Sequence, residues 1–495
     1  MNDVCLILEG TYPYVAGGVS VCVYDLIRNL PHLNFSIIHL AASGDSVKEL
    51  KYPIPNNIKE FHEIFLFDFN FSDEMTSQKI DPHLWDRVIE FHRCARRGDV
   101  SLFSEMYETF FNPRTKKVEI GDLLYRKEVW NILIQLYQEG GLKTDFSDFF
   151  WNFRFIYFPI FKILSSPIPK ARLYHSMCTG YAGLYAVAAK LLYQKPYLLT
   201  EHGIYTEERK IDISEAQWIP TLISESDVKA QKNPGFFKQW WISTFQFLGS
   251  LSYAHADHIS TIYDGNRIKQ IQGGADPEKI SIISNGIEVE RFSHVTEDQC
   301  PKKKNPQCFR IGFIGRVVPI KDVKTFLRSI KIVQEHVSNI EVLIMGPTEE
   351  DEEYYEECVL LTELLGLDTV IEFLGRVSSE NYYSTLDVLV LTSISEGQPL
   401  VVLEAGACGV PVVATEVGAN RELLYGRSHE DQVLGRSGIL TSLASPHETA
   451  EAIIKILKDT ELKKYLGEVA KKRVSRFYQQ EDILDQYHLM YRKYL

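Results

Sequence analysis

The chain alternates short apolar runs with stretches in which apolar positions recur every three or four residues. In the first 40 residues, the run at 4–8 is typical of a strand buried on both faces. A loop with two adjacent glycines follows, then a helical pattern at 23–30 and a second apolar run at 36–40. Strand, helix and strand in this order predict a parallel, right-handed βαβ unit.

This alternation continues in two halves of similar size. It predicts further strands at 173–175, 197–200, 259–262, 280–283, 310–314, 341–345, 370–373, 388–392 and 412–414. The polar stretch 293–308, with two prolines and three consecutive lysines, is typical of a solvated linker. We therefore expect an α/β fold with Rossmann-like, doubly wound domains at 1–292 and 309–475 that face a central cleft. A terminal helix at 476–495 is expected to cross back to the first domain.

Residues from about 60 to 165 interrupt this rhythm. The stretch is rich in phenylalanine, tyrosine and tryptophan, and its later half has a helical pattern. We interpret it as an aromatic-rich helical insertion packed on the first domain, and the sequence assigns it no function.

Charge and cysteine content narrow the class of protein. The formal net charge of -13 argues against a broad nucleic-acid footprint, which needs a basic face. The eight cysteines form no C-x-x-C pair and no zinc-type cluster, so we expect reduced thiols in a cytosol. The apolar stretch at the N-terminus follows no basic region, and no apolar run approaches the roughly 18–20 residues that span a bilayer. A cytoplasmic protein without a transmembrane segment is expected.

The segment 395–405 carries the most specific chemistry. Pro399 stands where a helix should begin, after a buried strand and a short loop. The amides of Leu400 and Val401, with the helix dipole, then form an anion site. Glu404 lies about one and a half turns further along, where its carboxylate can accept hydrogen bonds from a ribose diol.

Glu396 and Glu404 could also be the acid and nucleophile of a hydrolase. Eight residues at a helical rise of about 1.5 Å put them roughly 12 Å apart. Retaining glycosidases need about 5–5.5 Å between their carboxyl groups. The pair is therefore interpreted as two ligand-binding residues, not as the acid and nucleophile of a hydrolase.

Arg316 and Lys321 follow another predicted strand of the same half. A guanidinium fork and a point charge together suit the neutralisation of a diphosphate leaving group. In the first half, Gly17 and Gly18 follow a buried strand and let backbone approach a diphosphate, although a double glycine is often only a turn.

Arg316, Lys321 and the spaced pair Glu396 and Glu404 resemble the donor-site signature of GT-B glycosyltransferases of family 4. The resemblance continues in Ser-Asn-Gly-Ile-Glu at 284–288 and covers most of the chain. It implies that the two cations bind the donor diphosphate, that Glu404 binds ribose and that Glu396 contacts the transferred sugar. It also implies that Arg376 and Val377 lie near the nucleobase, and that neither a protein nucleophile nor a metal is required.

The strings at 8–20, 199–209 and 254–257 more specifically resemble the cytoplasmic glycosyltransferases of Pel exopolysaccharide assembly. The resemblance implies a UDP-sugar donor, with UDP-glucose or a related UDP-hexose as the candidate, a saccharide acceptor and an inner-membrane synthesis complex as partner. His202 follows the strand at 197–200 and is expected to open into the cleft. By resemblance to family 4, it faces the transferred sugar. One departure is Gln398-Pro399, where many family members have Phe-Gly.

We therefore expect a retaining hexosyltransferase that extends an exopolysaccharide, with His202, Glu396, Arg316 and Lys321 as catalytic residues and no cofactor. Two alternatives stay open. A UDP-sugar epimerase shares the GT-B architecture, so fold alone does not exclude it. A non-catalytic nucleotide-sugar sensor is disfavoured because the charged residues of the signature are all present.

Overall fold

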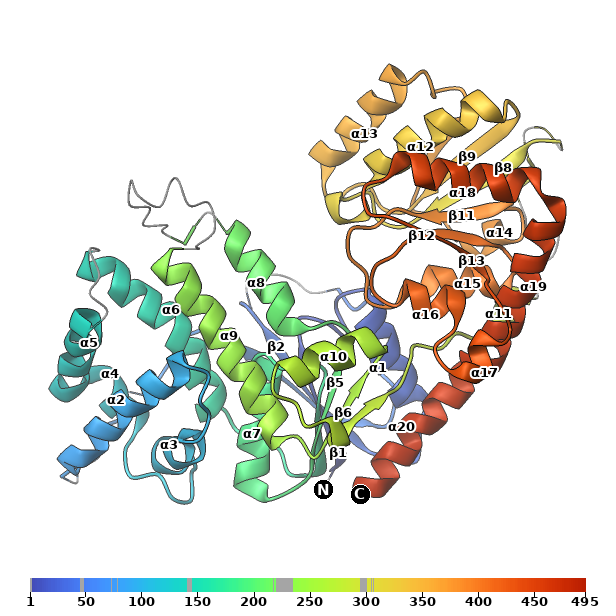
Figure 1. Cartoon of the computed structure of the whole chain (residues 1–495). Coiled ribbons are helices and arrows are strands. Elements are labelled where there is room, and N and C mark those ends of the chain that lie inside the picture. The colour runs from blue at the N-terminus through green and yellow to red at the C-terminus, as the bar shows by residue number, and fades with distance from the viewer. Residues whose placement is uncertain are drawn as a thin grey trace. The chain divides into compact units, whose positions relative to one another are not determined.

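The computed structural model divides the chain into two compact units, each built on one parallel sheet (Figure 1). Unit 1 comprises Met1–Thr261, Asn266–Ile282 and His488–Leu495, and unit 2 comprises Ile262–Gly265 and Ile283–Tyr487. The structure describes residues 2–44, 49–72, 74–77, 79–139, 145–216, 218–219, 235–293, 301–303, 305 and 307–495.

The sheet of unit 1 has seven parallel strands in the order β3-β2-β1-β4-β5-β6-β7. On β1, Cys5 and Ile7 join the core that includes helices α7 (Tyr181–Tyr193) and α9 (Phe236–His255), while Leu6 and Leu8 on the other face are equally buried. Burial of both faces explains the continuous apolar runs in the sequence. The strands are β1 (Asn2–Glu9), β2 (Phe35–Ala41), β3 (Ile58–Phe65), β4 (Ala171–Ser176), β5 (Tyr197–Glu201), β6 (His258–Thr261) and β7 (Ile280–Ile282).

Two helices of unit 1 matter for the site described below, α1 (Gly18–Asn29) and α8 (Tyr205–Glu215). Three more complete the alternation of helix and strand, α7 (Tyr181–Tyr193), α9 (Phe236–His255) and α10 (Asp264–Gln272).

Strand β3 corrects the expected start of the insertion. The sequence placed that start near residue 60, but Ile58–Phe65 pairs with β2 at the edge of the sheet. Four of its eight residues are exposed, in two adjacent pairs, so the strand forms no apolar run, because an edge strand is only partly covered.

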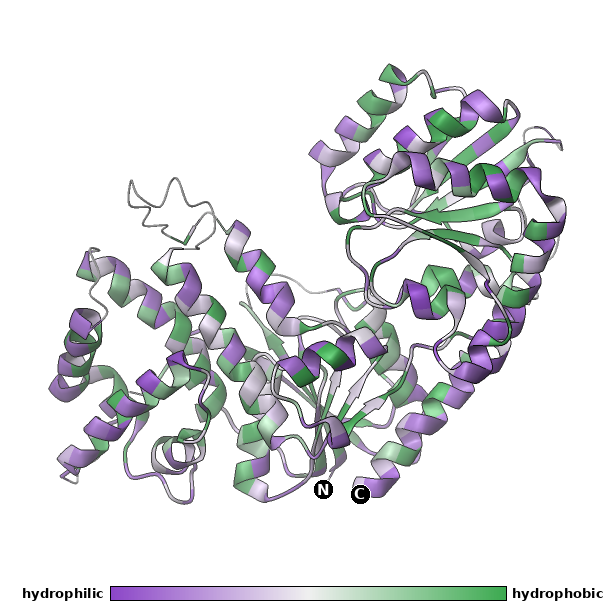
Figure 2. Ribbon diagram, viewed as in Figure 1, coloured by the Kyte–Doolittle hydropathy of each residue, from purple (hydrophilic) through white to green (hydrophobic). Residues whose placement is uncertain are grey.

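The insertion itself is helical and aromatic, as expected. It consists of α2 (Pro82–Arg96), α3 (Phe103–Phe110), α4 (Ile120–Tyr125), α5 (Lys127–Glu139) and α6 (Phe146–Ser165). Its aromatic rings continue the core of unit 1; Phe149, for example, stacks on Trp240 of α9 with ring centroids 5.2 Å apart. In Figure 2 these helices alternate apolar and polar residues along their length.

The sheet of unit 2 has six parallel strands in the order β10-β9-β8-β11-β12-β13. Along β9, Val342 and Ile344 face one core and Leu343 and Met345 face another, so this sheet is also covered on both faces. The strands are β8 (Phe309–Ile314), β9 (Ile340–Met345), β10 (Ile371–Gly375), β11 (Val388–Leu391), β12 (Val412–Thr415) and β13 (Gly438–Thr441).

The helices of unit 2 precede, connect and follow its strands. They include α11 (Val289–Ser293), α12 (Val323–His336), α13 (Glu352–Leu364), α14 (Glu380–Tyr383), α15 (Leu400–Ala407), α16 (Asn420–Tyr425), α17 (His429–Gln432), α18 (Pro446–Lys458), α19 (Thr460–Phe477) and α20 (Gln480–Tyr494). The end of α20, from His488, belongs to unit 1, where the Tyr491 hydroxyl lies 2.7 Å from Nδ1 of His175.

Unit 1 gives way to unit 2 after Ile282, whereas the sequence placed the boundary after residue 292. The segment that follows Ile282 is held by unit 2. The amide of Ile287 donates to the carbonyl of Tyr478 at 2.9 Å, and the amide of Gln480 donates to the carbonyl of Ile287 at 3.0 Å. The expected linker 293–308 lies partly outside the described residues.

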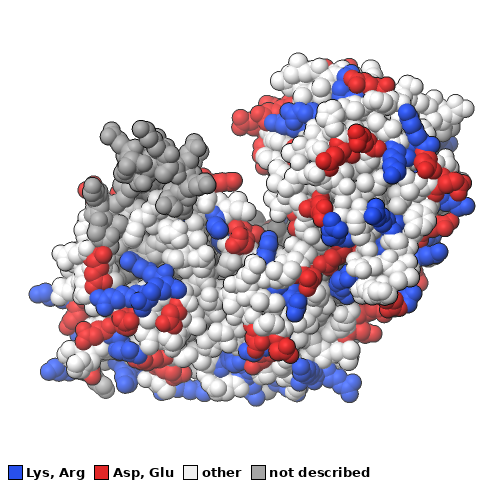
Figure 3. Space-filling view, in the orientation of Figure 1, with Lys and Arg blue, Asp and Glu red and all other residues white. Residues whose placement is uncertain are grey.

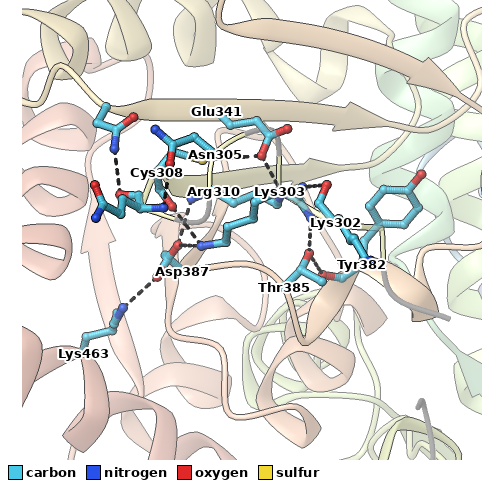
Figure 4. A network of polar contacts seen from close by, with 12 residues as sticks. Lys302, Lys303, Asn305, Cys308, Arg310, Glu341, Tyr382, Thr385, Asp387 and Lys463 are labelled. Carbon is cyan, nitrogen blue, oxygen red and sulfur yellow. Dashed lines mark hydrogen bonds and ion pairs between the residues drawn. The ribbon is translucent and has the colours of Figure 1, made fainter. Parts of the chain in front are cut away.

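The described end of that linker is fixed to unit 2 by a buried polar network around Arg310 (Figure 4). The Arg310 guanidinium pairs with Glu341 at 2.9 Å and donates to the carbonyls of Pro301 and Lys302 at 2.8 and 2.9 Å. Lys303 pairs with Asp387 at 2.7 Å. Because these bonds satisfy a buried guanidinium, they fix where the chain enters the sheet of unit 2.

None of the helices in the described part of the chain combines the length and the apolar character needed to cross a membrane. On the face seen in Figure 3, acidic and basic side chains are interspersed over both units.

Candidate functional site

The loops at the carboxyl ends of β8, β9 and β10 are joined through their backbones. The Gly315 amide donates to the carbonyl of Met345 at 2.9 Å, and the Gly346 amide donates to the carbonyl of Gly375 at 2.8 Å. Gly346 has φ +149°, and a Cβ atom there would lie 2.0 Å from the carbonyl oxygen of Gly315. Glycine is therefore required for the close approach that carries Arg316 and Arg376 to the same edge of the sheet.

Lys321 and Glu396 form an ion pair at this edge. Nζ of Lys321 lies 2.5 Å from Oε1 of Glu396, and their side chains are only 20% and 9% exposed. The Ser393 hydroxyl also donates to Oε1 of Glu396, at 2.6 Å. The sequence assigned Lys321 to a diphosphate and Glu396 to a sugar, and the structure brings the two side chains into direct contact.

The backbone around this pair is held in place by loop contacts. The Ile394 amide donates to the carbonyl of Ile320 at 2.8 Å, which joins the two loops that carry Lys321 and Glu396. Behind Glu396, the Ala419 amide donates to the carbonyl of Gly397 at 2.8 Å. Gly418 has φ +54°, and a Cβ atom there would lie 2.2 Å from the carbonyl oxygen of Glu396. Only glycine permits this packing.

Pro399 caps α15 rather than beginning it. Leu400 is the first helical residue, so Pro399 lies one position earlier than the sequence indicated. The amides of Leu400 and Val401 lie in the first turn, where no carbonyl of the preceding turn of the helix can accept from them. The expected anion site therefore rests on the same two amides.

Gln398 has a role that the sequence did not predict. The amide of Asn285 donates to Oε1 of Gln398 at 2.6 Å, and Nδ2 of Asn285 donates to the carbonyl of Gln398 at 3.4 Å. The departure from the family pattern at Gln398 thus ties the Ser-Asn-Gly segment to the start of α15. Asn285 and Gln398 lie 113 positions apart in the sequence, so no local pattern indicated their contact.

Glu404 is also held by a residue that the sequence did not single out. The Tyr383 hydroxyl, at the end of α14, donates to Oε2 of Glu404. Burial raises the pKa of Glu404, while the hydrogen bond from Tyr383 and the charge of Arg291 oppose that rise. Tyr383 is fully buried. The contact leaves the carboxylate in place to accept further hydrogen bonds.

Arg316 and Arg376 are exposed and paired with acidic residues. Arg316 donates to Glu350 and Arg376 donates to Glu349, each at 2.7 Å. The Arg376 guanidinium holds the pKa of Glu349 down to about 2. Glu349 and Glu350 lie just before α13, and both are exposed. Val377, next to Arg376, is half-buried.

The remaining candidates, Gly17, Gly18 and His202, belong to unit 1. Gly17 caps α1 in an extended conformation, and a Cβ atom on Gly17 or Gly18 would meet nothing within 4 Å. Packing within the chain therefore does not require glycine at either position. His202 follows β5, and its buried Nε2 has no hydrogen-bond partner among the described residues. Burial lowers the pKa of His202 to about 4, so the ring is neutral at pH 7.

Two of the strings quoted from the first half of the sequence meet in unit 1. Glu9 ends β1 and precedes the glycine loop, while Tyr205 begins α8 three residues after His202. The Tyr205 hydroxyl donates to Oε1 of Glu9, and burial raises the pKa of that carboxyl. The contact fixes the start of the glycine loop to the segment that carries His202.

Unit 2 thus presents groups that suit a phosphorylated nucleoside. Lys321, Arg316 and the first amides of α15 offer positive charge and donors for phosphate, and Glu404 offers an acceptor for hydroxyl groups. Within the residues that the structure describes, no group of three or more histidine, cysteine, aspartate or glutamate side chains could hold a metal ion.

Known solved structures share this fold. Anabaena HepE in complex with UDP is 14% identical, with a TM-score of 0.59 over 99% of this chain and 100% of that chain. The sucrose-phosphate synthase of Thermosynechococcus elongatus is 15% identical, with a TM-score of 0.59 over 99% and 98%. The expected GT-B fold, with two Rossmann-like sheets, is confirmed.

Curated relatives match part of the chain. The D-inositol 3-phosphate glycosyltransferase of Corynebacterium jeikeium is 29% identical over 40% of this chain and 48% of its own length. The capsular polysaccharide biosynthesis glycosyltransferase CapM of Staphylococcus aureus is 27% identical over 45% and 57%. The chain therefore spans about half the length of the curated relatives that it matches.

Two families match the chain. Residues 308–459 match the family described as "Glycosyl transferases group 1". Residues 2–278, more than half of the chain, match "Domain of unknown function (DUF3492)". The chain therefore belongs to the DUF3492 family, with a GT-B fold and a glycosyl transferases group 1 domain in its second half.

Proposed function

We propose that this protein is a retaining glycosyltransferase that moves a hexose from a UDP-sugar to a saccharide acceptor and needs no metal. The observation that carries the proposal is the contact of Lys321 with Glu396, next to the start of α15, in the domain that matches the glycosyl transferases of group 1. A cation for the leaving diphosphate and a carboxylate for the sugar meet there.

The nucleotide is inferred as UDP. HepE, which shares the fold, has been solved with UDP and with UDP-glucose. UDP-glucose, or a related UDP-hexose, is the candidate donor because the first half of the sequence resembles the Pel glycosyltransferases. The same resemblance supports a growing exopolysaccharide as acceptor and an inner-membrane synthesis complex as partner.

Each group has a role in the proposed transfer. Lys321, Arg316 and the amides of Leu400 and Val401 stabilise the departing diphosphate. Glu404 accepts hydrogen bonds from the ribose, and Glu396 orients the transferred sugar. Neutral His202 hydrogen-bonds the same sugar and carries no charge that would repel an oxocarbenium-like transition state.

The proposed transfer requires no covalent intermediate with the enzyme. The bond between the anomeric carbon and the UDP oxygen breaks, while the acceptor oxygen bonds the anomeric carbon on the same face. The acceptor proton passes to the leaving phosphate. Configuration at the anomeric carbon is therefore retained.

The test is UDP release from a panel of UDP-sugars, with the product anomer assigned by NMR, in the presence and absence of a chelator. We expect UDP release that depends on a saccharide acceptor and is unchanged by the chelator. Lys321→Ala should abolish the signal, and Lys324→Ala, which removes a partly buried lysine paired with Glu357, is the matched control. Inversion at the sugar C2 without UDP release would establish an epimerase instead, and metal-dependent turnover would exclude the proposed chemistry.

A further inference from the structure

Glu201, the last residue of β5, carries a buried carboxyl group to which the proposed transfer assigns no role. The residue is 1% exposed. Burial raises the pKa of this carboxyl, and the groups that oppose the rise are neutral hydrogen-bond donors, with no cation among them. A buried carboxylate without a cation is costly unless hydrogen bonds satisfy it. The donors around Glu201 therefore indicate what this carboxylate holds in place.

Three neutral side chains donate to the Glu201 carboxylate. The Thr179 hydroxyl donates to Oε1 at 3.1 Å, while the Tyr253 hydroxyl and Nε2 of Gln270 donate to Oε2 at 2.7 and 3.0 Å. All three donors are buried. They come from the segment after β4, from α9 and from α10, so the carboxylate joins three elements of unit 1 at the end of β5.

The next residue along the chain, His202, is held by one of the same elements. Nδ2 of Asn266, in α10, donates to the His202 carbonyl at 3.0 Å. The backbone is therefore fixed on both sides of the His202 side chain, by Glu201 before it and by Asn266 after it. The buried Nε2 of the ring has no hydrogen-bond partner among the described residues. Because Nε2 makes no hydrogen bond that would orient the ring, the position of the ring depends on this backbone.

A purely structural residue at this position would need no carboxylate. An apolar side chain of similar size fills such a space without the loss of hydration that a buried charge suffers. The other end of β5 shows a buried contact between neutral groups, since the Tyr197 hydroxyl lies 2.9 Å from Oγ of Ser176. Within β5, a charged residue stands only at the end that precedes His202.

We propose that Glu201 is a positioning residue that holds His202 against the transferred sugar, through its contacts with Thr179, Tyr253 and Gln270. The inference rests on the role proposed for His202 in the transfer. A displacement of about 1 Å at a reacting centre can cost roughly 100-fold in rate. UDP lacks the transferred sugar, so loss of Glu201 should lower turnover and leave UDP binding unchanged.

The first measurement is kcat, with KM for the donor and Kd for UDP on the same preparations. Glu201→Gln places an amide NH2 group among hydrogen-bond donors, so the side chain must turn and kcat should fall by about 10- to 100-fold. KM and Kd should stay within about twofold of the wild type. Thr179→Val removes one donor and should act in the same direction, and Thr179→Ser, which restores the hydroxyl, should recover kcat.

Tyr253→Phe and Tyr197→Phe form a matched pair. Each removes the hydroxyl of a buried tyrosine in unit 1, but only Tyr253 contacts Glu201. We expect both variants to lower Tm to a similar extent and only Tyr253→Phe to lower kcat. A merely structural role for the network would instead make kcat follow Tm in both variants.

The second measurement does not depend on turnover. NMR of the full chain with isotope-labelled histidine follows the titration of the His202 ring, whose signal is assigned from its loss in His202→Asn. Burial lowers the pKa of His202 to about 4, so a ring displaced toward solvent should titrate nearer 6.5. Removal of a negative charge does not raise a histidine pKa, so a rise in Glu201→Gln reports displacement. We expect a rise in Glu201→Gln and Tyr253→Phe and none in Tyr197→Phe.

An unchanged His202 titration in the folded Glu201→Gln variant would overturn the proposal, and so would a displaced ring with wild-type kcat. The Tyr253→Phe and Thr179→Val variants decide the same question should Glu201→Gln fail to fold. Absence of UDP release by the wild-type chain would refute the proposed transfer instead. The titration of His202 would then still show whether Glu201 positions the ring, so the two failures are distinguishable.

Discussion

The ammonium of Lys321 lies 2.5 Å from Oε1 of Glu396, although 75 residues separate the two in the sequence. The pair is largely shielded from solvent, with side-chain exposures of 20% and 9%. A diphosphate that approaches Lys321 therefore competes with Glu396 for the ammonium. This contact couples the two proposed roles, charge neutralisation and sugar orientation, and it decides the direction of the first two predictions.

Lys321→Ala should weaken UDP binding by roughly 10- to 150-fold, since it removes a charge-assisted contact with the diphosphate. Arg316→Ala should act in the same direction but less strongly, because Arg316 is 52% exposed and already paired with Glu350. Calorimetric titration with UDP measures both. Lys324→Ala and Arg421→Ala, which break ion pairs elsewhere in unit 2, should bind as the wild type. Unchanged UDP affinity in Lys321→Ala would show that UDP does not bind at the proposed site in unit 2.

Glu396→Gln should depress turnover at least about tenfold while leaving UDP affinity equal to, or slightly above, that of the wild type. The carboxylate is assigned to the transferred sugar, which UDP lacks, and its loss frees Lys321 for the diphosphate. The measurements are kcat with the donor sugar and Kd for UDP on the same preparation. A weaker UDP complex in a folded Glu396→Gln variant would contradict this assignment.

Glu404→Gln should stabilise unit 2 and weaken UDP binding at the same time. Burial raises the pKa of Glu404 in the folded state, so folding favours its protonated form. This preference contributes fully to the free energy of unfolding below the pKa of glutamate in the unfolded chain, near 4.3. The contribution is lost as the pH rises through the raised pKa of the folded state. Glutamine avoids that loss. We therefore expect a higher Tm than that of the wild type at pH 7–8 and no gain near pH 4. A lower Tm at pH 8 would indicate a purely structural carboxylate.

Tyr383→Phe should shift the pH dependence of UDP binding to higher pH. The Tyr383 hydroxyl lowers the pKa of Glu404, and so does Arg291 of α11, which is itself paired with Glu380 of α14. Without the hydroxyl, only the charge of Arg291 opposes the rise in the pKa of Glu404 that burial causes. The carboxylate is therefore protonated at a higher pH than in the wild type. UDP affinity measured from pH 5 to 8 should fall sooner in the variant and match the wild type at the alkaline end. A uniform loss at every pH would mean that Tyr383 only packs.

Acid should destabilise unit 1 through its buried histidines. Burial lowers the pKa values of His92 and His175 to about 3. In the unfolded chain the pKa of histidine is near 6.5, so the unfolded state binds more protons than the folded state below that pH. The free energy of unfolding is therefore highest above pH 6.5 and falls as the pH drops toward 3. All six tryptophans lie in unit 1, so their fluorescence in urea reports its unfolding.

His175→Gln provides the control for this effect. The variant should be less stable at pH 7, because His175 contacts Thr200 and Tyr491 at 2.8 and 2.7 Å. The free energy of unfolding of the variant should nevertheless decrease less steeply than that of the wild type as the pH falls. The difference in slope should be up to about 1.4 kcal/mol per pH unit. An unchanged slope would show that His175 is protonated in the folded state.

The sequence determined the interior of both sheets. Central strands such as β1 and β9 are covered on both faces, so their residues are continuously apolar and a local pattern suffices to find them. The edge strands β3 and β13 were not predicted, because partial exposure removes that pattern. The positions of Lys321 and Glu396 after strands, and of Glu404 within α15, likewise followed from local pattern and motif.

The tertiary structure alone decided which of these side chains meet. Lys321 with Glu396, Tyr383 with Glu404 and Asn285 with Gln398 are separated by 75, 21 and 113 residues. Their contacts depend on the order in which the strands of unit 2 are hydrogen-bonded, since that order sets which loops share an edge. Apolar periodicity records whether a residue is buried, but it carries no information about its neighbour across the sheet. The contacts between the predicted site residues and their partners were therefore not predictable from the sequence.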